Sequence, residues 1–374
     1  MMKVSVSNPI LGKGELINLK KCINTNWLSS NGEFNKKLEN GFAKIVNRKY
    51  CSTVSNGTIA LEIAIRALNL KEGTEVIVPS FTIISPIIAI IRNGLIPILV
   101  DSNDFWAMDI QDVEKKITKK TSAILVVHTY SFPADMNKII KLKNKFKLKL
   151  IEDAAEMHGQ KYYGKPCGSF GEVSTFSFYS NKFITSGEGG AICTNSKKLY
   201  ERINSLRNLS FGKKKRFEHE ELSYNARMSN LQAAVAYAQI KNLKKVVKLK
   251  FQIAEYYNKF LSKSEFIKIL PNKNSYSRNI YWVYGILVLK NQKNNLVKFL
   301  KSKNIETRDF FVSMHNQPIL KRMNLVKNKD KFPHCDNLEK NGIYLPSGPK
   351  MSLNELNYVN NSIKEFFIKK YSKF

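Results

Sequence analysis

The stretch TFSFYSNKFITSGEGGAICT, residues 175–194, decides the fold because it places one lysine between two predicted strands. TFSFYS (175–180) alternates apolar and polar residues, which is typical of a strand, and GGAICTN (189–195) predicts another. The glycines between them predict a turn that needs small residues. Lys182 is therefore either one more solvated charge or a partly desolvated amine. In the second case its pKa is lowered toward the reactive form that Schiff-base chemistry requires.

The chain before this stretch alternates short apolar runs with helical patterns, as parallel β-α-β units do. Helices are predicted over 56–68 and 85–94, the second with proline in its first turn and glycine at its end. Strands are predicted over 50–55, 75–80, 97–102, 121–130 and 146–155. This order predicts an α/β fold with a mainly parallel sheet flanked by helices. Ligand sites in such sheets lie where the strands end.

The character of the chain changes near Leu231. A long helical pattern over 230–261 leads into a lysine-rich part with a clear strand at 281–289 and a clear helix at 296–304. We therefore expect two domains. These are a large α/β domain over 1–235 and a smaller α+β domain over 236–374, entered through the long helix.

The net charge of +31, from 61 basic and 30 acidic residues, raises the possibility of a nucleic-acid-binding protein. The lysines are spread along the chain, however, and no homeodomain, zinc-finger or RNA-binding signature accompanies them. A solvated lysine-rich surface is the favoured interpretation. Its positive field would help to recruit an anionic small substrate.

The cysteines and histidines indicate the cellular compartment and argue against a metal site. The five cysteines are scattered without CxxC spacing, which indicates a reducing cytoplasm, and the five histidines form no metal-ligand pair. No signal peptide is recognised at the start. The most apolar stretch, residues 81–100, contains Pro86, Arg92, Gly94 and Pro97, so it is too broken to span a bilayer.

The motif VSNGTIAL (54–61) opens a predicted helix directly after a strand. Free backbone N–H groups, the helix dipole and the hydroxyl of Thr58 are the usual provision for a phosphate at such a position. An ordinary helix N-cap, with no ligand, explains the same residues.

The motif LIEDAAEMHG (150–159) places Glu152 and Asp153 at the end of an apolar strand. Either acid can simply cap a following helix. Alternatively, a buried carboxylate here faces a cationic ring nitrogen, whose charge would keep the acid ionised.

Together, a phosphate anchor, a carboxylate at a strand end and a lysine on a turn meet the requirements of pyridoxal phosphate. This cofactor needs its phosphate held and its ring nitrogen protonated, so that the ring accepts electrons. It also needs a lysine at its aldehyde.

With these motifs in place, the chain resembles the DegT/DnrJ-type sugar aminotransferases, which are fold type I pyridoxal-phosphate enzymes. The resemblance runs through nearly the whole chain, and within the family it is strongest to the GDP-perosamine synthases. The motifs that support it are VSNGTIALEIAI, EVIVPSFT, IEDAAEMHG, GSFGEVSTFSFYSNKFITSGEGGAICT, YNARMSNLQAAVAYAQ and NGIYLPSGP. The resemblance implies the aspartate aminotransferase-like fold.

The resemblance also implies roles for individual residues. Lys182 matches the Schiff-base lysine, and Asp153 matches the aspartate that pairs with the ring nitrogen. Glu156 matches the position beside the cofactor's ring hydroxyl. The residues that match the phosphate ligands are Gly57, Thr58, Ser177 and, from the neighbouring subunit, Asn225. A homodimer with a shared active site is therefore expected.

Three further positions are predicted from the same resemblance. Ile83 stands where relatives usually carry an aromatic residue against the cofactor ring, so it would cover that face by dispersion contact instead. Arg308 and His315 fall in a segment that lies near the substrate in similar enzymes. A surface ion pair for Arg308 and a structural role for His315 are the alternatives.

The expected reaction moves an amino group from L-glutamate to C4 of a nucleotide-linked 4-keto-6-deoxy sugar. The best match is GDP-4-keto-6-deoxymannose, giving GDP-perosamine for a surface polysaccharide such as O-antigen. UDP- and dTDP-linked sugars are alternatives, because relatives that use them share these cofactor motifs. A non-catalytic regulator that binds pyridoxal phosphate is a further alternative, against which the intact Lys182, Asp153 and Glu156 argue.

Overall fold

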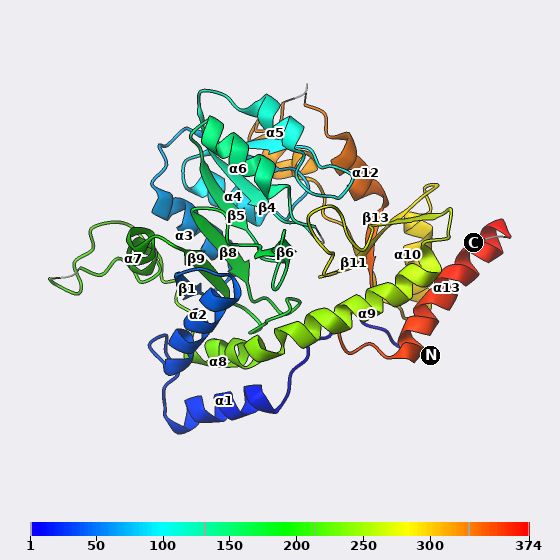
Figure 1. Ribbon diagram of the computed structural model, residues 1–374, viewed down its shortest axis with the longest axis horizontal. Helices are drawn as coiled ribbons and strands as arrows, with labels where there is room; N and C mark the ends of the chain where they lie inside the picture. The colour runs from blue at the N-terminus through cyan, green and yellow to red at the C-terminus, as the bar shows by residue number, and fades with distance from the viewer. Residues whose placement is uncertain (1, 131, 213, 328–329, 373) are drawn as a thin grey trace.

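The computed structural model describes residues 2–130, 132–212, 214–327, 330–372 and 374. Within these residues the larger sheet has seven strands in the order β1-β9-β8-β5-β4-β2-β3 (Figure 1). They are β1 (Tyr50–Val54), β2 (Glu75–Pro79), β3 (Ile96–Val100), β4 (Thr121–Val127), β5 (Lys149–Asp153), β8 (Val173–Ser177) and β9 (Gly190–Thr194). Strand β9 is antiparallel to β1 and β8, and the other pairs are parallel. The predicted mainly parallel sheet is confirmed.

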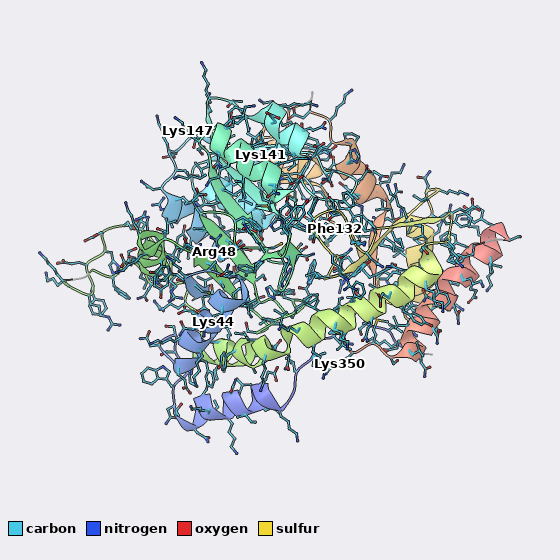
Figure 2. The ribbon with its side chains drawn as sticks, viewed as in Figure 1. Lys44, Arg48, Phe132, Lys141, Lys147 and Lys350 are labelled. Atoms are coloured by element: carbon cyan, nitrogen blue, oxygen red, sulfur yellow. The ribbon has the colours of Figure 1, made fainter. Side chains whose placement is uncertain are left out.

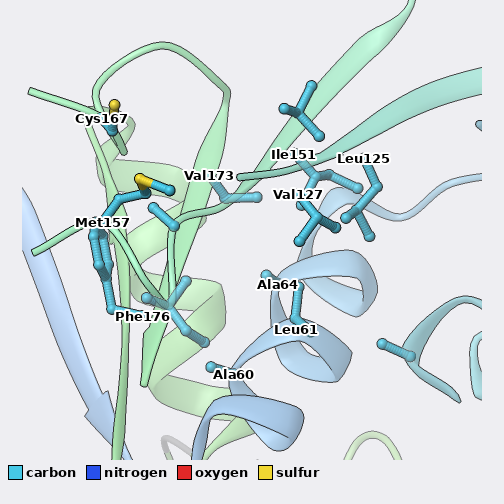
Figure 3. Packing of buried hydrophobic residues seen from close by; sticks show 14 of the residues in the cluster. Ala60, Leu61, Ala64, Leu125, Val127, Ile151, Met157, Cys167, Val173 and Phe176 are labelled. Atoms are coloured by element: carbon cyan, nitrogen blue, oxygen red, sulfur yellow. The ribbon is translucent and has the colours of Figure 1, made fainter. Parts of the chain in front are cut away.

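Helices surround this sheet and the main core, most of them in direct contact with its strands. They are α1 (Lys13–Asn24), α2 (Glu33–Ile45), α3 (Gly57–Leu68), α4 (Ser85–Arg92), α5 (Ile110–Lys116), α6 (Met136–Lys145), α7 (Lys197–Leu206) and α8 (Asn230–Gln239). Helix α3 begins where Asn56 caps it, the Asn56 side chain accepting a hydrogen bond from the Ile59 N–H. Helix α3 packs mainly on β8 and β9, and Figure 3 shows Ala60, on its small face, beside Phe176 of β8. Small residues here let α3 approach the sheet closely.

A second, antiparallel sheet has the order β10-β11-β13-β12. Its strands are β10 (Ile267–Ile269), β11 (Tyr284–Val288), β12 (Arg308–Asp309) and β13 (Gly342–Leu345). The remaining elements are α9 (Leu243–Leu261), α10 (Lys293–Ser302), α11 (Pro318–Arg322), α12 (Pro333–Asn341), α13 (Leu353–Tyr371) and the short hairpin of β6 (Lys161–Tyr162) and β7 (Lys165–Pro166). Helices α9, α10 and α13 contribute to a separate core, which includes Tyr257, Leu300 and Phe367.

The long helix predicted over 230–261 is divided in the structure. A 3₁₀ turn at Ile240–Asn242 separates α8, which packs on α1 and α2, from α9, which packs on α13 and β10 (Figure 1). The turn therefore joins the part of the chain around the first sheet to the part around the second. Val4 packs in the second core, where it bridges to Ile305. The predicted boundary at residue 235 stays a prediction.

The carboxyl ends of the parallel strands bring the predicted site residues to one edge of the large sheet. Asp153 is the last residue of β5, Ser177 is the last residue of β8, and β1 leads through Ser55 and Asn56 into α3. Parallel strands placed side by side end at the same edge, so these residues lie together although they are far apart in sequence.

Lysine side chains are distributed over many elements rather than gathered in one patch. Lys44 on α2, Lys141 on α6 and Lys350 before α13 come from separate parts of the fold (Figure 2). This dispersal matches the prediction of a solvated surface. Among the described helices none is long and apolar enough to cross a membrane.

Candidate active site

A cavity of about 640 Å³ opens at the carboxyl edge of the large sheet. It brings together seven of the residues predicted from the sequence, namely Gly57, Thr58, Ile83, Asp153, Glu156, Ser177 and Lys182. Three aromatic residues from beyond the large sheet, Trp282, Phe311 and Tyr344, complete its wall.

The N-terminus of α3 forms a cradle for an anion at this cavity. The N–H groups of Ile59 and Ala60 bond to Asn56, whereas those of Gly57 and Thr58 have no acceptor in the described part of the chain. The absence of a side chain at Gly57 is essential, because a Cβ there would lie 2.9 Å from the Cβ of Ser177. Two backbone donors, the helix dipole and nearby hydroxyls thus converge on one space that suits a phosphate.

A second observation concerns a buried hydroxyl on the cavity wall. Thr175 Oγ1 lacks a hydrogen-bond partner in the described part of the chain, although the residue is buried. Thr175 pairs with Asp153 across the β5–β8 ladder, so both residues lie at the same level of the cavity. A buried polar atom of this kind costs free energy unless a ligand satisfies it. A polar ligand group beside Asp153 would provide the missing partner.

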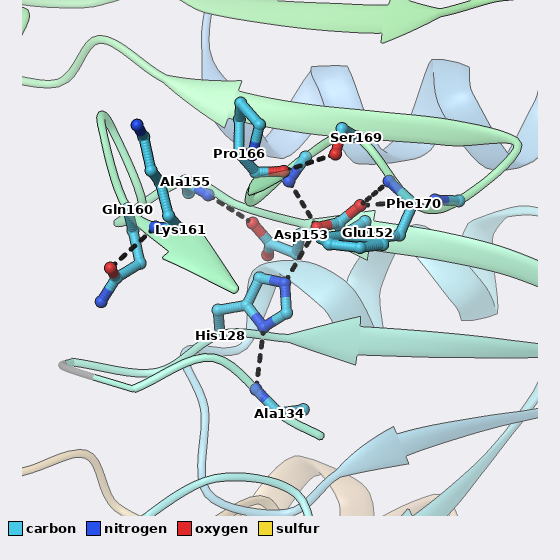
Figure 4. Close-up of polar contacts among 12 residues, drawn as sticks. His128, Ala134, Glu152, Asp153, Ala155, Gln160, Lys161, Pro166, Ser169 and Phe170 are labelled. Carbon is cyan, nitrogen blue, oxygen red and sulfur yellow. Dashed lines mark hydrogen bonds and ion pairs between the residues drawn. The ribbon is translucent and has the colours of Figure 1, made fainter. Parts of the chain in front are cut away.

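Asp153 itself is buried at the end of β5. Its Oδ1 accepts a hydrogen bond from the Ala155 N–H at 3.1 Å (Figure 4). Burial raises the pKa of Asp153 to about 6, against the opposing effects of the Ala155 N–H and the positive charge of Lys182. A protonated ring nitrogen placed against this carboxylate would favour its ionised form. Residues 154–160 form turns rather than a helix, so the alternative in which Asp153 caps a following helix is wrong.

Lys182 lies on the segment that joins β8 to β9. Its backbone N–H bonds to the Tyr179 carbonyl at 2.9 Å, and the Ser186 N–H bonds back to the Phe178 carbonyl. Gly187 and Gly189 have positive φ values of 81° and 156°, which any other residue would adopt only with strain. The predicted glycine-rich turn is confirmed, and it returns the chain to the sheet with Lys182 inside the cavity.

The amine of Lys182 is placed among groups that act on its protonation. Its Nζ lies 3.8 Å from Glu156 Oε1, and both side chains are nine-tenths buried. Burial lowers the pKa of Lys182, whereas the carboxylates of Glu156 and Asp153 act in the opposite direction. Burial favours the neutral form of Glu156 too, and it raises the pKa of this carboxyl to about 7 against the opposing charge of Lys182. The site therefore holds a buried amine with a lowered pKa beside a buried carboxyl with a raised pKa.

Tyr130, which sequence reasoning missed, fixes Glu156. Its φ of 61° is in the left-handed region, which is unusual for a bulky residue. This conformation directs its backbone N–H to Glu156 Oε2 at 2.6 Å. The Tyr130 hydroxyl accepts a hydrogen bond from the Phe311 N–H, so the residue also connects the two sheets. Strain at such a position is commonly held by the surrounding packing at functional sites.

The neighbouring Glu152 has a separate, structural set of partners. It accepts hydrogen bonds from the N–H groups of Gly168 and Phe170, and its Oε1 lies 3.0 Å from His128 Nε2 (Figure 4). His128 Nδ1 accepts the Ala134 N–H, so its Nε2–H donates to Glu152. Burial opposes ionisation of Glu152, but these donors hold its pKa below the ordinary value. This pair anchors the end of β5 behind Asp153.

The three other predicted residues do not line the cavity. Asn225 is exposed, and Arg308 is exposed beside Tyr344 on the neighbouring strand. His315 is buried, with Nδ1 2.7 Å from Ser80 Oγ and Nε2 2.8 Å from Asp336 Oδ1. These partners support the alternative in which His315 has a structural role. Ile83 does line the cavity and is 48% exposed, so its side chain is available to a ligand.

A phosphate cradle at a helix N-terminus, a carboxylate at a strand end and a buried lysine share one cavity in this fold. They suit pyridoxal phosphate, and they define the class of fold type I enzymes that use this cofactor. The chain belongs to the DegT/DnrJ/EryC1/StrS aminotransferase family, whose sequence profile matches residues 9–364. It is thus a pyridoxal-phosphate-dependent aminotransferase.

Individual relatives cover nearly the whole chain. A protein of Escherichia coli O157:H7 named GDP-perosamine synthase is 38% identical over 98% of this chain and 99% of its own length. One of the same name from Vibrio cholerae is 36% identical over 97% of this chain and 99% of its own length. The crystal structure of DesV from S. venezuelae superimposes with a TM-score of 0.88 at 28% identity and covers 94% of each chain. The predicted family and fold type are confirmed.

Proposed function

We propose that this aminotransferase moves an amino group from L-glutamate to C4 of GDP-4-keto-6-deoxymannose and so forms GDP-perosamine. The similarity of the whole chain to two proteins named GDP-perosamine synthase supports this choice above all. The cavity of about 640 Å³ has room for a cofactor together with part of a sugar substrate.

The lining of the cavity supports a set of residues that would hold the cofactor. The N–H groups of Gly57 and Thr58 and the hydroxyl of Ser177 would bind its phosphate, and Asp153 would pair with its ring nitrogen. Ile83 and Glu156, which also line the cavity, would contact the ring and its hydroxyl. When bound, pyridoxal phosphate supplies an aldehyde for the amine and a ring that accepts electrons.

Lys182 performs the proton transfers. Its Nζ would hold the cofactor, and an amino donor would free the amine. The free amine then removes a proton from a carbon of the amino donor. Its Nζ later delivers a proton to the sugar substrate. Burial in the cavity lowers the pKa of the amine and so favours the neutral form that a general base requires. Asp153 would stabilise a protonated ring nitrogen.

The active enzyme is a homodimer in which Asn225 of one subunit reaches the phosphate site of the other. Asn225 is exposed and does not line the cavity of its own chain, as this role requires. Helix α1 leaves Leu16 and Ile17 about two-thirds exposed, at 67% and 66%. Exposed apolar residues of this size suit contact with a second copy. Arg308, beside the cavity residue Tyr344, approaches the substrate.

The enzyme acts in the cytoplasm, where nucleotide sugars are made, and its product serves a surface polysaccharide such as O-antigen. The five described cysteines are free and buried, as suits a reducing compartment.

A substrate panel tests the proposal. The purified enzyme is incubated with pyridoxal phosphate, L-glutamate and one of the GDP-, UDP- or dTDP-linked 4-keto-6-deoxy sugars, and product masses are followed. We expect an amino sugar and equimolar 2-oxoglutarate with the GDP-linked substrate. Turnover of only a UDP- or dTDP-linked sugar would contradict the assigned nucleotide. A lack of 2-oxoglutarate with every sugar would contradict the reaction.

A further inference from the structure

We infer that Trp282 is a positioning residue that receives the ammonium group of Lys182 on its indole face whenever the lysine is released. The Lys182 Nζ lies 3.8 Å from the centre of a Trp282 ring. This is well inside the range in which a cation and an indole attract each other. The inference rests on the proposed role of Lys182, which is bonded and released in alternation during the reaction.

Trp282 comes from outside the large sheet. It precedes β11 of the second sheet, and its side chain is buried. Its indole Nε1–H donates a hydrogen bond to the Asn181 carbonyl at 3.0 Å, which is the peptide group directly before Lys182. One side chain therefore fixes the backbone of the lysine segment through its N–H and contacts the lysine amine through its ring.

The residues around Trp282 hold its ring in place against the Lys182 amine. Trp282 is stacked on Tyr130 at 6.0 Å between ring centres, and Tyr130 in turn fixes Glu156. A second cavity of about 20 Å³ adjoins Trp282 and Lys182 on the side of Lys250, with room for about one water molecule. The Lys182 side chain is nine-tenths buried, and limited contact with water strengthens the attraction between its ammonium group and the ring.

A contact with the indole face would keep the released Lys182 amine near the reaction centre. An ammonium group that paired only with Glu156 would be held as a cation, whereas one that turned to solvent would leave the reaction centre. The indole face attracts the ammonium form without accepting its proton. It can therefore keep Nζ near the cavity while Lys182 gains and loses protons.

Other charged groups also act on Lys182 and must be kept constant in a test. Glu156 and Asp153 favour its charged form, and the positive charge of Lys182 acts on His158. Lys250 lines the adjoining small cavity. Substitution of Trp282 by a smaller residue would change the hydration of all these groups. A test must therefore weaken the ring's attraction for a cation without changing its shape.

Fluorinated tryptophans provide this test. The full-length chain is produced in a tryptophan auxotroph with tryptophan or with mono-, di- or trifluorotryptophan, and cofactor is removed. The pKa of Lys182 is then measured by competitive acetylation with trace acetic anhydride across pH, with mass spectrometry of the Lys182 peptide. Cofactor-free protein makes the result independent of whether the proposed reaction is correct.

The ring stabilises the ammonium form, so a weaker ring must lower the pKa of Lys182. We expect a stepwise fall with each fluorine, reaching about half a unit to one unit in the trifluoro protein. The matched control is Trp282→Phe grown on the same amino acids, where only Trp27 and Trp106 are fluorinated. A pKa of Lys182 that is the same across the series, or an equal shift in the control, would overturn the inference.

A kinetic comparison supplies a second readout. Trp282→Phe keeps an aromatic face, whereas Trp282→Leu does not. Relative to wild type, we expect kcat to fall roughly ten-fold more in the leucine variant than in the phenylalanine variant, with KM for the sugar little changed. Equal kcat values for the two variants would contradict a role of the ring. The fluorine series remains decisive if the leucine variant does not fold.

Discussion

The Nζ of Lys182 lies 3.8 Å from Oε1 of Glu156, in a cavity where both side chains are nine-tenths buried. In water such a pair would contribute little, but burial makes each group sensitive to the charge of the other. Burial alone drives both groups toward their neutral forms, and their mutual attraction opposes it. Burial thus favours the neutral form of this lysine, which an amine that must be both nucleophile and base requires.

Replacement of Lys182 by alanine should abolish transamination. We expect the visible absorbance of the lysine-bound cofactor to disappear and kcat to fall by at least about a thousand-fold, since no nearby group replaces the amine. Absorbance spectra and 2-oxoglutarate release provide the measurements. Lys141→Ala, at an exposed position on α6, is the matched control and should behave as wild type. A normal spectrum in Lys182→Ala would contradict the assignment.

Replacement of Asp153 by asparagine should change how the stability of the cofactor-free protein depends on pH. The folded pKa of Asp153, about 6, lies above its unfolded value. Folding therefore favours the protonated form, and the native state loses stability as pH rises from about 4 through 6. Asparagine cannot ionise, so Asp153→Asn should be more stable than wild type at pH 8 by on the order of 2–3 kcal/mol. The advantage should shrink toward pH 4.

Urea unfolding of both proteins at several pH values measures this difference. Pyridoxal phosphate should reverse the ranking at pH 8, because a positive ring nitrogen stabilises only the ionised aspartate. Equal pH dependence of the two cofactor-free proteins would show that the carboxyl of Asp153 is not desolvated as described.

The phosphate cradle gives a prediction about cofactor affinity. In Gly57→Ala the new methyl group would meet Ser177, 2.9 Å away, and displace the backbone donors. We expect the Kd for pyridoxal phosphate to rise about ten- to a hundred-fold, and about ten-fold for Ser177→Ala. Ser174→Ala, which removes a buried hydroxyl of the same strand that has no partner in the described structure, should leave the Kd unchanged. Fluorescence titration distinguishes these cases.

The large sheet could be predicted from the sequence because each of its strands is a short apolar run that ends in polar residues. The sequence also predicted that Lys182, Asp153 and the N-terminus of α3 lie close together, since parallel strands share a carboxyl edge. Trp282 and Tyr130 could not be found in this way. Trp282 reaches the cavity from the second sheet, and the importance of Tyr130 lies in its backbone conformation. Neither property has a period or a spacing in the sequence.

Mixing of two inactive variants tests whether the active site is shared between subunits. Lys182→Ala and Asn225→Ala homodimers should each be strongly impaired, because one lacks the amine and the other a phosphate ligand. In a hybrid dimer, the site with Lys182 from one subunit and Asn225 from the other is complete, while the second site lacks both. Random exchange makes half of the dimers hybrid, so about a quarter of wild-type activity should return. Activity is measured after subunit exchange in mild urea, with each variant treated alone as the control. If the mixture is no more active than its components, Asn225 does not act across the dimer.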